Sequence, residues 1–351
     1  MTLDTFDGLL NWENLQAWIA ANDLPGSGPV DSVTPILGGS QNALFMLTRG
    51  SERLVLRRPP KHLRPNNNET MRREARLLKG LAGTDVPHAE LYGACDDESV
   101  IGATFYIMEP LDGFSPMHQL PGQYATDASW RREMGAEMVR AAAALSKVDY
   151  VANGLADYGK PDNWHGRQVE RWRSQLESYQ TMENYPGQSL PLVDETGRWL
   201  TDNMPSDGRV GLIHGDFQYP NVMYFDDRPK ISGLIDWELS TLGDPLLDLG
   251  WMLSSWSGEG DPEGKTPVVT PWDGFLTRAE LVTLYGELTG RDMSAMPWFA
   301  VLGCYKLACI LEGSYARACA GKMPKELGES LHKYALWLMV RAQQIIGRGK
   351  V

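Results

Sequence analysis

Histidine, cysteine and positive charge are scarce in this chain of 351 residues, and each shortage argues against a class of function. The six histidines form no HxH or HExxH pair, so a metal-dependent hydrolase that uses His214 and nearby aspartates lacks ligands. The four cysteines fit no CxxC pattern, and buried free thiols are expected rather than a metal site. Lysine and arginine number 33 against 45 acidic residues, and the net charge of -12 argues against a nucleic-acid partner.

Long hydrophobic runs are also missing. No apolar run approaches the roughly 20 residues that span a bilayer, so no membrane partner is expected. The N-terminus, residues 1–4, is acidic and has neither the basic nor the apolar region of a signal peptide, which predicts a cytoplasmic protein. Hydrophobic residues make up 42% and charged residues 22%, as in ordinary globular proteins, and the length suits two lobes.

The N-terminal third alternates apolar segments with turn residues. Leu10, Leu15, Trp18 and Ile19 recur at helical spacing, which predicts a short helix over 9–22. Apolar runs separated by glycines and other turn residues follow, and they predict an antiparallel meander. The predicted strands cover 33–37, 43–47 and 53–57, with a helix at 69–81 and a further strand at 105–108.

Beyond residue 113 the chain is mostly helical, with predicted helices over 131–145, 168–179 and 297–320. One compact stretch, 212–236, has instead two short β-rich runs around a turn. The sequence therefore predicts an α+β protein with a small strand-rich N-terminal part and a larger helical C-terminal part.

One loop, which ends at Asn221, carries a carboxylate and an amide five residues apart. Phosphoryl transfer from ATP needs a carboxylate to orient the acceptor hydroxyl and oxygen ligands to hold magnesium. Asp216 and Asn221 can point into a shared cleft, and a hairpin brings Asp236 to the same place. A single Asp or Asn in a loop is more often a cap or turn former. The combination HGDxxxxN, a hairpin and an apolar strand ending in Asp is much more specific.

Two longer motifs, HGDFQYPN and GLIDWELSTLGDPLLDLGWML, contain these residues. With them, the chain from about Ile36 to Gly321 resembles the aminoglycoside phosphotransferase/choline kinase superfamily, which has the protein-kinase-like fold. It is most similar to the kinase-like domains associated with acyl-CoA dehydrogenases. The resemblance implies a bilobal α+β fold with a nucleotide-binding lobe at 1–108, a hinge at 109–113 and a catalytic, substrate-binding lobe at 114–351.

The resemblance also implies roles for the motif residues. Asp216 would be the catalytic base, and Asn221 and Asp236 would bind Mg²⁺ and bridge it to the phosphates of ATP. His214 would be a structural residue of the catalytic loop. Asp248 would hydrogen-bond to that loop and brace it from behind.

Two neighbours of these motifs have more local roles. Asp244 is expected to be the N-cap of a helix that has Pro245 in its first position. Glu238 is a candidate for supporting the metal site, with a solvent-facing polar residue as the alternative.

Residues 38–42, Gly-Gly-Ser-Gln-Asn, lie between two predicted strands, where backbone amides and small side chains can meet phosphate. Gly39, Ser40 and Asn42 are the candidates, although two glycines between strands also fit an ordinary hairpin turn. In the kinase pattern, a later strand carries a lysine that contacts the phosphates and pairs with a helix glutamate.

The lysine position is occupied by Arg57, and Glu74 is its expected partner. Arginine keeps the charge and can pair bidentately with phosphate or carboxylate, but its geometry differs from that of lysine. If the register of the strand differs, Arg58 occupies the lysine position instead. The alternative for both arginines is an ordinary exposed strand end with no role toward phosphate.

Residues 108–111 match the hinge between lobes, where the backbone of Glu109 and Leu111 would bind adenine. A strand edge followed by a proline turn has the same appearance in sequence.

The acceptor side is the least specified part. The stretch 251–262 and the helix 301–320 are expected to cover it, and the acidic run 259–263 could attract a polycation or be a solvated loop. The possible contacts are Trp251, Trp256, Lys306, Glu312, Tyr315 and Arg317. Lys306 and Arg317 favour an anionic acceptor, so an aminoglycoside, a hydroxyacyl compound and another metabolite all stay open.

Two classes of function fit these residues. The first is an ATP-dependent kinase that phosphorylates a hydroxyl of a small molecule. The second is a catalytically weak nucleotide-binding regulator, and Arg57 is its only support. Intact Asp216, Asn221 and Asp236 favour the kinase, because a regulator has no chemical need for all three.

Overall fold

The computed structural model describes residues 8–36, 42–187, 190–264 and 268–351, and the chain forms two compact units. The first unit contains Met1–Gly113 and two later segments, Tyr150–Ala156 and Ser232–Glu238. The second unit contains Phe114–Asp149, Asp157–Ile231 and Leu239–Val351. Strands dominate the first unit and helices the second, which confirms the predicted α+β, bilobal class.

A five-stranded sheet of order β1-β2-β3-β5-β4 forms the first unit, and all neighbouring strands are antiparallel. Its strands are β1 (Ser32–Ile36), β2 (Ala43–Arg49), β3 (Glu52–Arg58), β4 (Leu91–Cys95) and β5 (Phe105–Met108). The predicted meander and the predicted strand at 105–108 are confirmed. No clear strand signal marks β4, because its sequence, LYGAC, is short and interrupted by a glycine.

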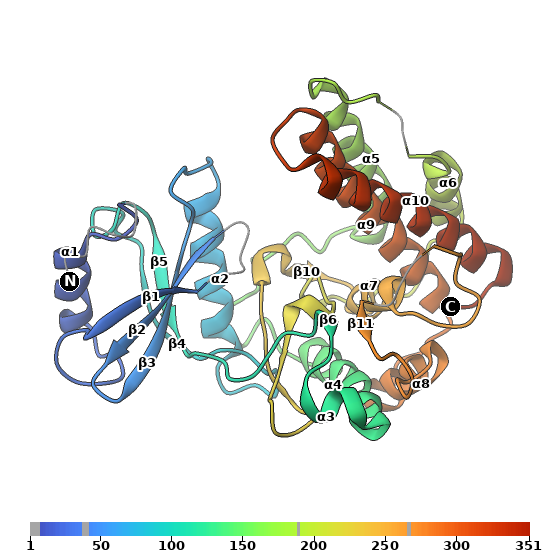
Figure 1. Ribbon diagram of the computed structural model, residues 1–351. Helices are drawn as coiled ribbons and strands as arrows, with labels where there is room; N and C mark the ends of the chain where they lie inside the picture. Colours follow the sequence, from blue (N-terminus) through green and yellow to red (C-terminus); the bar gives the residue numbers. More distant parts are fainter. Residues whose placement is uncertain (1–7, 37–41, 188–189, 265–267) are drawn as a thin grey trace. The chain divides into compact units, whose positions relative to one another are not determined.

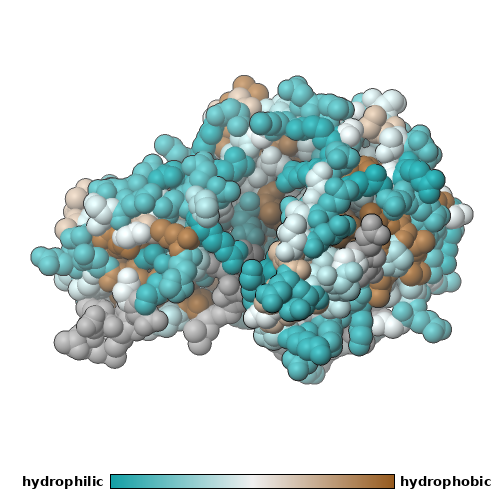
Figure 2. All heavy atoms as spheres, turned by 90° about the horizontal axis from the view of Figure 1, so that it is seen from above, coloured by the Kyte–Doolittle hydropathy of each residue, from teal (hydrophilic) through white to brown (hydrophobic). Residues whose placement is uncertain are grey.

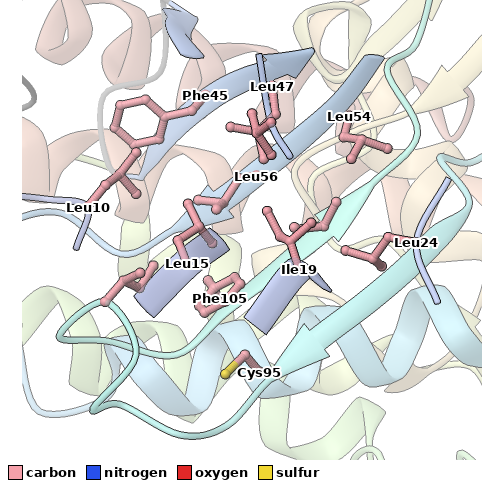
Figure 3. Close-up of a cluster of buried hydrophobic side chains, with 13 residues drawn as sticks. Leu10, Leu15, Ile19, Leu24, Phe45, Leu47, Leu54, Leu56, Cys95 and Phe105 are labelled. Carbon is pink, nitrogen blue, oxygen red and sulfur yellow. The ribbon is translucent and has the colours of Figure 1, made fainter. Parts of the chain in front are cut away.

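Two helices cover opposite faces of this sheet, α1 (Trp12–Ala21) and α2 (Asn67–Leu81) (Figure 1). Figure 3 shows the buried cluster that joins α1 to the strands, which includes Leu15, Ile19, Leu54, Leu56 and Phe105. Full burial of one such side chain stabilises the fold by about 1.5–3 kcal/mol. Because side chains alternate along a strand, Arg57 and Tyr106 face α2 instead.

The second unit is mainly helical, and the three predicted helices are confirmed with small changes at their ends. Its helices are α3 (Gly122–Thr126), α4 (Ala128–Ser146), α5 (Gln168–Ser178), α6 (Val193–Asp202), α7 (Leu246–Ser255), α8 (Arg278–Thr289), α9 (Met296–Cys319) and α10 (Lys325–Arg348). Short 3-10 helices cover His165–Arg167, Tyr179–Thr181, Tyr219–Asn221 and Trp237–Leu239.

α7 and α9 cross where each helix has a glycine. A Cβ atom on Gly250 of α7 would lie 2.4 Å from the Phe299 backbone oxygen, and one on Gly303 of α9 would lie 2.7 Å from the Gly250 oxygen. Side chains at these two positions would therefore force the helices apart. The close crossing holds the middle of α9 against the helix that carries Asp248.

Short strands outside the five-stranded sheet pair two by two. β7 (Gly211–Ile213) pairs antiparallel with β10 (Thr241–Gly243), and β6 (His118–Gln119) pairs parallel with β11 (Val269–Thr270). The two predicted β-rich runs are β8 (Val222–Tyr224) and β9 (Ile231–Leu234). Between them the chain reverses, and the Phe225 N–H donates to the Lys230 oxygen at 3.0 Å.

α9 is long and apolar enough, by length and composition, to cross a membrane, although Lys306 and Glu312 interrupt its apolar sequence. However, 83% of its most apolar 18-residue window is buried inside the protein. Packing within the second unit therefore accounts for its composition. Cys304 and Cys309 of this helix are buried and form no disulfide, like the buried Cys95, while Cys319 is half-buried.

Among the residues that the structure describes, the exposed large apolar side chains are spread along the sequence. Figure 2 shows a face on which hydrophilic residues predominate and hydrophobic residues form small separate groups. The exposed large apolar side chains, such as Met117, Val151 and Leu327, come from distant parts of the sequence. Scattered apolar residues of this kind are normal on a protein surface.

Candidate functional site

The loop after β7 carries the predicted catalytic carboxylate. Asp216 is half-buried; its Oδ1 accepts a hydrogen bond from Gln218 Nε2 at 2.7 Å, and its Oδ2 accepts one from Asn221 Nδ2 at 2.7 Å. Asn221 Nδ2 also donates to the Asp216 backbone oxygen at 2.9 Å. Two amides therefore fix the carboxylate in one orientation. Its remaining lone pairs can accept a proton from an acceptor hydroxyl.

Gly215 lets the loop turn sharply just before Asp216. Its φ of 82° lies in the left-handed region that favours glycine, and a Cβ there would lie 2.3 Å from the Leu239 backbone oxygen. The carboxylate of Asp248 accepts the N–H groups of His214 at 2.7 Å and Gly215 at 2.9 Å. The bracing role implied for Asp248 depends on these bonds, and its effect on turnover stays a prediction.

Asp248 lies in the first turn of α7 and is 2% exposed. Burial raises the pKa of Asp248, while the charges of His214 and Lys306 and the two backbone N–H groups act in the opposite direction. A carboxylate placed behind the loop in this way serves the backbone and does not face a substrate.

Asp244 anchors the start of α7, which begins at Leu246, one residue later than predicted, because Pro245 is its N-cap. Asp244 Oδ1 accepts the Leu246 N–H at 3.0 Å. Its two oxygens also accept from Nη1 and Nη2 of Arg291, at 2.5 and 2.7 Å, and His165 Nε2 lies 3.1 Å away. Burial opposes ionisation, but the hydrogen bonds from His165 and Arg291 and the charge of Arg291 lower the pKa of Asp244 overall.

The two predicted magnesium ligands each keep an oxygen free. Asn221 Nδ2 faces Asp216, and its Oδ1 accepts no hydrogen bond within the described chain. Asp236 belongs to the first unit, and its side chain is 40% exposed. Its Oδ1 lies 3.1 Å from Arg57 Nη2, whereas its Oδ2 has no hydrogen bond from a described residue. Amide and carboxylate oxygens are the hard donors that Mg²⁺ prefers, so the donor set fits this ion.

Arg57 is the centre of a buried charge cluster in the first unit. Its Nε lies 2.9 Å from Glu74 Oε2, and its Nη2 donates to Glu74 Oε1 at 3.4 Å and to Asp236 Oδ1 at 3.1 Å. The Tyr106 hydroxyl donates to Glu74 Oε2 at 2.7 Å. Burial lowers the pKa of Arg57, but Tyr106, Glu74 and Asp236 more than reverse this, so Arg57 stays positively charged. The predicted Arg57–Glu74 contact is therefore present, and its role toward ATP stays a prediction.

Arg58 serves a different purpose. It is 3% exposed, and its guanidinium donates to the backbone oxygens of Leu9, Pro59 and Ile101. Burial lowers the pKa of Arg58 to about 10. Bound to carbonyl groups, it supports the interior of the first unit, and only Arg57 of the two contacts Glu74.

The predicted hinge residues follow β5. The Glu109 N–H donates to the Glu90 oxygen at 2.9 Å, while the Glu109 carbonyl and the Leu111 N–H make no hydrogen bond with any described residue. These are the backbone groups on which adenine binding would depend. The Leu111 side chain packs over Gly233 of β9, where a Cβ would lie 2.5 Å from Leu111 Cδ1. Gly233 thus makes room beside the predicted adenine site.

Of the predicted phosphate-binding loop, the structure describes only Asn42. It is half-buried in a bend directly before β2. Gly39 and Ser40 lie outside the described residues, so their contact with phosphate stays a prediction.

Two residues proposed for the acceptor side serve the interior of the second unit. Trp256 is 1% exposed and stacks on Tyr219, with the ring centroids 5.2 Å apart. Glu312 is fully buried; its Oε1 accepts from the Tyr185 hydroxyl at 2.8 Å, and its Oε2 lies 2.7 Å from His332 Nδ1. Neither side chain is available for an acceptor in this arrangement.

The acidic run 259–263 is partly neutralised. Asp261 Oδ1 is shared by the guanidinium groups of Arg278 and Arg341, and the Trp337 indole donates to the Pro262 oxygen at 2.8 Å. These contacts tie the run to α8 and α10, so it is anchored on the second unit and not merely a solvated loop. A polycation would meet less negative charge there than the sequence implies.

Three other acceptor candidates differ in burial. Tyr315 and Arg317 are half-buried, and Arg317 donates to Ser314 Oγ at 2.8 Å. Trp251 is 1% exposed and lies against the ammonium group of Lys306, 4.2 Å from ring centroid to Nζ.

Some contacts of the site are not predicted from sequence. Gln218 stands two positions after Asp216 inside the HGDFQYPN motif, so the motif itself could have indicated its contact with Asp216. Tyr106 and Arg291 carry no such signal, because their partners Glu74 and Asp244 are 32 and 47 positions away.

A protein-only metal centre is not seen in the part of the chain that the structure describes. No group of three or more His, Cys, Asp or Glu side chains there could hold a metal ion. Mg²⁺ does not need such a group, because this ion usually keeps waters and substrate phosphates as ligands beside one or two protein oxygens.

Comparison with known proteins gives a consistent result. The chain is 32% identical over 326 residues to acyl-CoA dehydrogenase family member 11 of Rattus norvegicus, with 89% of this chain and 40% of the relative aligned. It therefore spans about two fifths of that relative's length. Among solved structures, it is similar to a candidate aminoglycoside phosphotransferase from Ralstonia eutropha, with 33% identity, a TM-score of 0.79 and coverage of 95% of this chain and 98% of that one.

A more distant structure shares the fold alone. It is a thermostable mutant of aminoglycoside phosphotransferase APH(4)-Ia in a complex with AMP-PNP and hygromycin B. The identity is 15%, the TM-score is 0.57, and the match covers 96% of this chain and 98% of that one. The family model described as "Phosphotransferase enzyme family" matches residues 32–279. With more than half of the chain matched, the protein belongs to the phosphotransferase enzyme family and has its kinase-like fold.

Proposed function

We propose that the protein transfers the γ-phosphate of ATP to a hydroxyl group of a small molecule. The observation that carries the proposal is the way in which the Asp216 carboxylate is held. Its carboxylate is oriented by Gln218 and Asn221 on a loop whose backbone is held by Asp248. A carboxylate held in this way suits proton transfer from a hydroxyl, which contributes about 10²- to 10⁴-fold to a rate.

The other predicted residues supply binding. Asn221 Oδ1 and Asp236 Oδ2 are the oxygens that would hold Mg²⁺, and the ion, when bound, neutralises charge on the transferred phosphoryl group. Arg57 keeps its positive charge for the phosphates while paired with Glu74. The Glu109 carbonyl and the Leu111 N–H would accept from and donate to adenine.

The names of the relatives suggest a chemical class for the acceptor, but no single compound. The matched relatives are named acyl-CoA dehydrogenase family members, which supports hydroxyacyl compounds as the first acceptors to test. The complex of a fold neighbour with AMP-PNP and hygromycin B supports ATP and a hydroxylated small molecule as the two substrates. An aminoglycoside is the second class, and fold alone does not decide between them.

The first experiment measures nucleotide binding and turnover together. Thermal unfolding is followed with Mg-AMP-PNP, with AMP-PNP plus EDTA, and with neither. Ligand that binds only the folded state raises stability by about 2.7 kcal/mol at 100 times Kd. We expect a magnesium-dependent rise in Tm, and ADP release from ATP in the presence of at least one hydroxyacyl compound or aminoglycoside.

Two variants make the test specific. Asp216→Asn is expected to keep the shift with Mg-AMP-PNP and to lose about 10²- to 10⁴-fold in turnover. Asp226→Asn, an exposed change in the turn after β8, is the matched control and should leave both unchanged. No shift at millimolar Mg-AMP-PNP would contradict the proposal. A shift without turnover of any acceptor would favour the nucleotide-binding regulator.

A further inference from the structure

Lys306 is a buried lysine whose ammonium group contacts the catalytic loop. It lies in the middle of α9 and is 5% exposed, and its Nζ donates to the Gly215 backbone oxygen at 2.5 Å. The same atom lies 4.2 Å from the ring centroid of Trp251 and 5.4 Å from that of Trp172. Within the described chain it has no carboxylate at ion-pair distance. Two aromatic faces and one carbonyl therefore surround this charge.

This environment is unfavourable for a charge in itself. Burying an ammonium without an adjacent carboxylate removes its hydration, and ring faces replace only part of it. Burial lowers the pKa of Lys306 to about 8, although the charges of Asp216 and Asp248 act to raise it and Arg171 acts to lower it further. An apolar side chain would satisfy the packing of α9 at lower cost. The contact with the loop is what distinguishes lysine here.

The contact with Lys306 gives the Gly215 backbone a second hydrogen-bond partner. The Gly215 N–H donates to Asp248 Oδ1 at 2.9 Å, and the Gly215 carbonyl accepts from Lys306 Nζ at 2.5 Å. The next N–H, that of Asp216, donates to His214 Nδ1 at 3.3 Å. Gly215 adopts its left-handed φ of 82° without strain, and because glycine is conformationally free, these hydrogen bonds are what fix its geometry. The peptide plane that leads into Asp216 is therefore fixed on both sides.

We propose that Lys306 is a positioning residue for Asp216. It holds the Gly215–Asp216 peptide plane through the carbonyl and places a positive charge near the two carboxylates Asp216 and Asp248. It acts through the loop and does not touch the substrate. The part of this inference that concerns turnover rests on the proposed phosphotransferase function. The part that concerns loop geometry stands on the contacts alone.

The main variant is Lys306→Met, which keeps the length of the side chain and removes the donor and the charge. We expect kcat to fall by about 10²-fold, because small displacements of a reacting group have effects of this size. The KM for ATP is expected to change by less than about twofold, since the nucleotide is bound elsewhere. Hydrogen exchange of the amides at 214–217 is expected to become faster.

Two further variants separate a positioning role from general loss of stability. Cys309 lies on the same helix and is fully buried, so the variant Cys309→Ala should lower the stability of α9 without changing a contact of the catalytic loop. It should leave kcat and loop exchange unchanged when both variants are assayed well below their unfolding temperatures. Lys306→Gln keeps a donor without the charge, and it also serves if the Met variant does not fold. We expect it to restore slow exchange at 214–217 but not the full kcat.

The outcomes are distinct. Unchanged kcat and unchanged loop exchange in both Lys306 variants would overturn the inference, whatever the wild type turns over. If the wild-type protein neither binds Mg-AMP-PNP nor turns over an acceptor, the proposed function fails, and the exchange measurement still decides whether Lys306 holds the loop. A loss of kcat in Cys309→Ala equal to that in Lys306→Met would show that helix stability, and not the contact with Gly215, controls turnover.

Discussion

Replacement of Asp244 by asparagine tests the ion pair that anchors α7. Asp244 is 1% exposed, and Arg291, its bidentate partner, has a side chain that is 7% exposed. Asparagine caps a helix about as well as aspartate, so the bond to the Leu246 N–H can survive the change. The substitution therefore removes mainly the negative charge that faces Arg291 and His165.

The magnitude follows from this geometry. Opposite unit charges about 4 Å apart attract by about 4 kcal/mol at an effective dielectric constant of 20. Removing one partner of a buried pair leaves the other uncompensated and costs about 3–5 kcal/mol. Because the asparagine oxygen can still accept from Arg291, we expect the lower end, about 3 kcal/mol. With an m-value of about 2 kcal/mol per M urea, the unfolding midpoint falls by about 1.5 M.

The assay is urea unfolding followed by tryptophan fluorescence, since Trp298 packs on the His165 ring, with the centroids 5.3 Å apart. Asp127→Asn is the control, because Asp127 caps α4 through Ser129 but has no ion pair with a described residue. This variant should unfold with wild type. A midpoint for Asp244→Asn within about 0.3 M of wild type would refute the argument.

The pH dependence gives a second check on the same variant. The pKa of Asp244 is lowered in the folded protein from its ordinary value of 3.8. The stability that its ionised form contributes is therefore fully present above pH 3.8 and is lost as the pH falls through the lower folded pKa. The difference between wild type and Asp244→Asn should be constant near neutral pH and shrink below pH 3.8.

Three further predictions concern the site. Asp236→Asn should remove the magnesium-dependent part of the Tm shift with AMP-PNP while keeping the fold, and an unchanged shift would mean that the metal lies elsewhere. Gly233→Val should displace Leu111 and weaken AMP-PNP binding by at least about tenfold by calorimetry, since a Cβ there lies 2.5 Å from Leu111 Cδ1. The pKa of Lys306 is about 8 in the folded protein against an ordinary value of 10.5. The free energy of unfolding of wild type should therefore rise, relative to that of Lys306→Met, as the pH increases from 8 to 10.5. Urea midpoints of the two proteins that stay parallel across this range would contradict the buried charge.

The parts of the fold that sequence predicts are those with strong local signals. The helix at 69–81, the meander and the strand at 105–108 carry clear periodicity, and all three are present. β4 lacks such a signal, because LYGAC becomes a strand only through its pairing with β5. Local patterns thus mark elements that are amphipathic by themselves and miss those that depend on a neighbour.

The candidate site divides in the same way. The HGDxxxxN spacing is local, so the contact between Asp216 and Asn221 could be expected from sequence. The sequence does not show which of the adjacent residues Arg57 and Arg58 contacts Glu74. The alternation of side chains along the strand directs Arg57 to Glu74 and Arg58 to backbone carbonyls. From the sequence, Lys306 is predicted only as an acceptor contact, because nothing local indicates its partner Gly215, which lies 91 positions away.

The composition of the first unit has a consequence for how the chain is made. Ser232–Glu238 belongs to this unit, where the Leu234 N–H donates to the Pro87 oxygen at 2.9 Å and Asp236 pairs with Arg57. Domains generally fold as units during synthesis, the N-terminal one first. Here the N-terminal unit is incomplete until residue 238 has left the ribosome, after much of the second unit. A nascent chain that stops at residue 113 lacks Gly233 against Leu111 and Asp236 against Arg57, so the first unit reaches its complete structure only after most of the chain has been made.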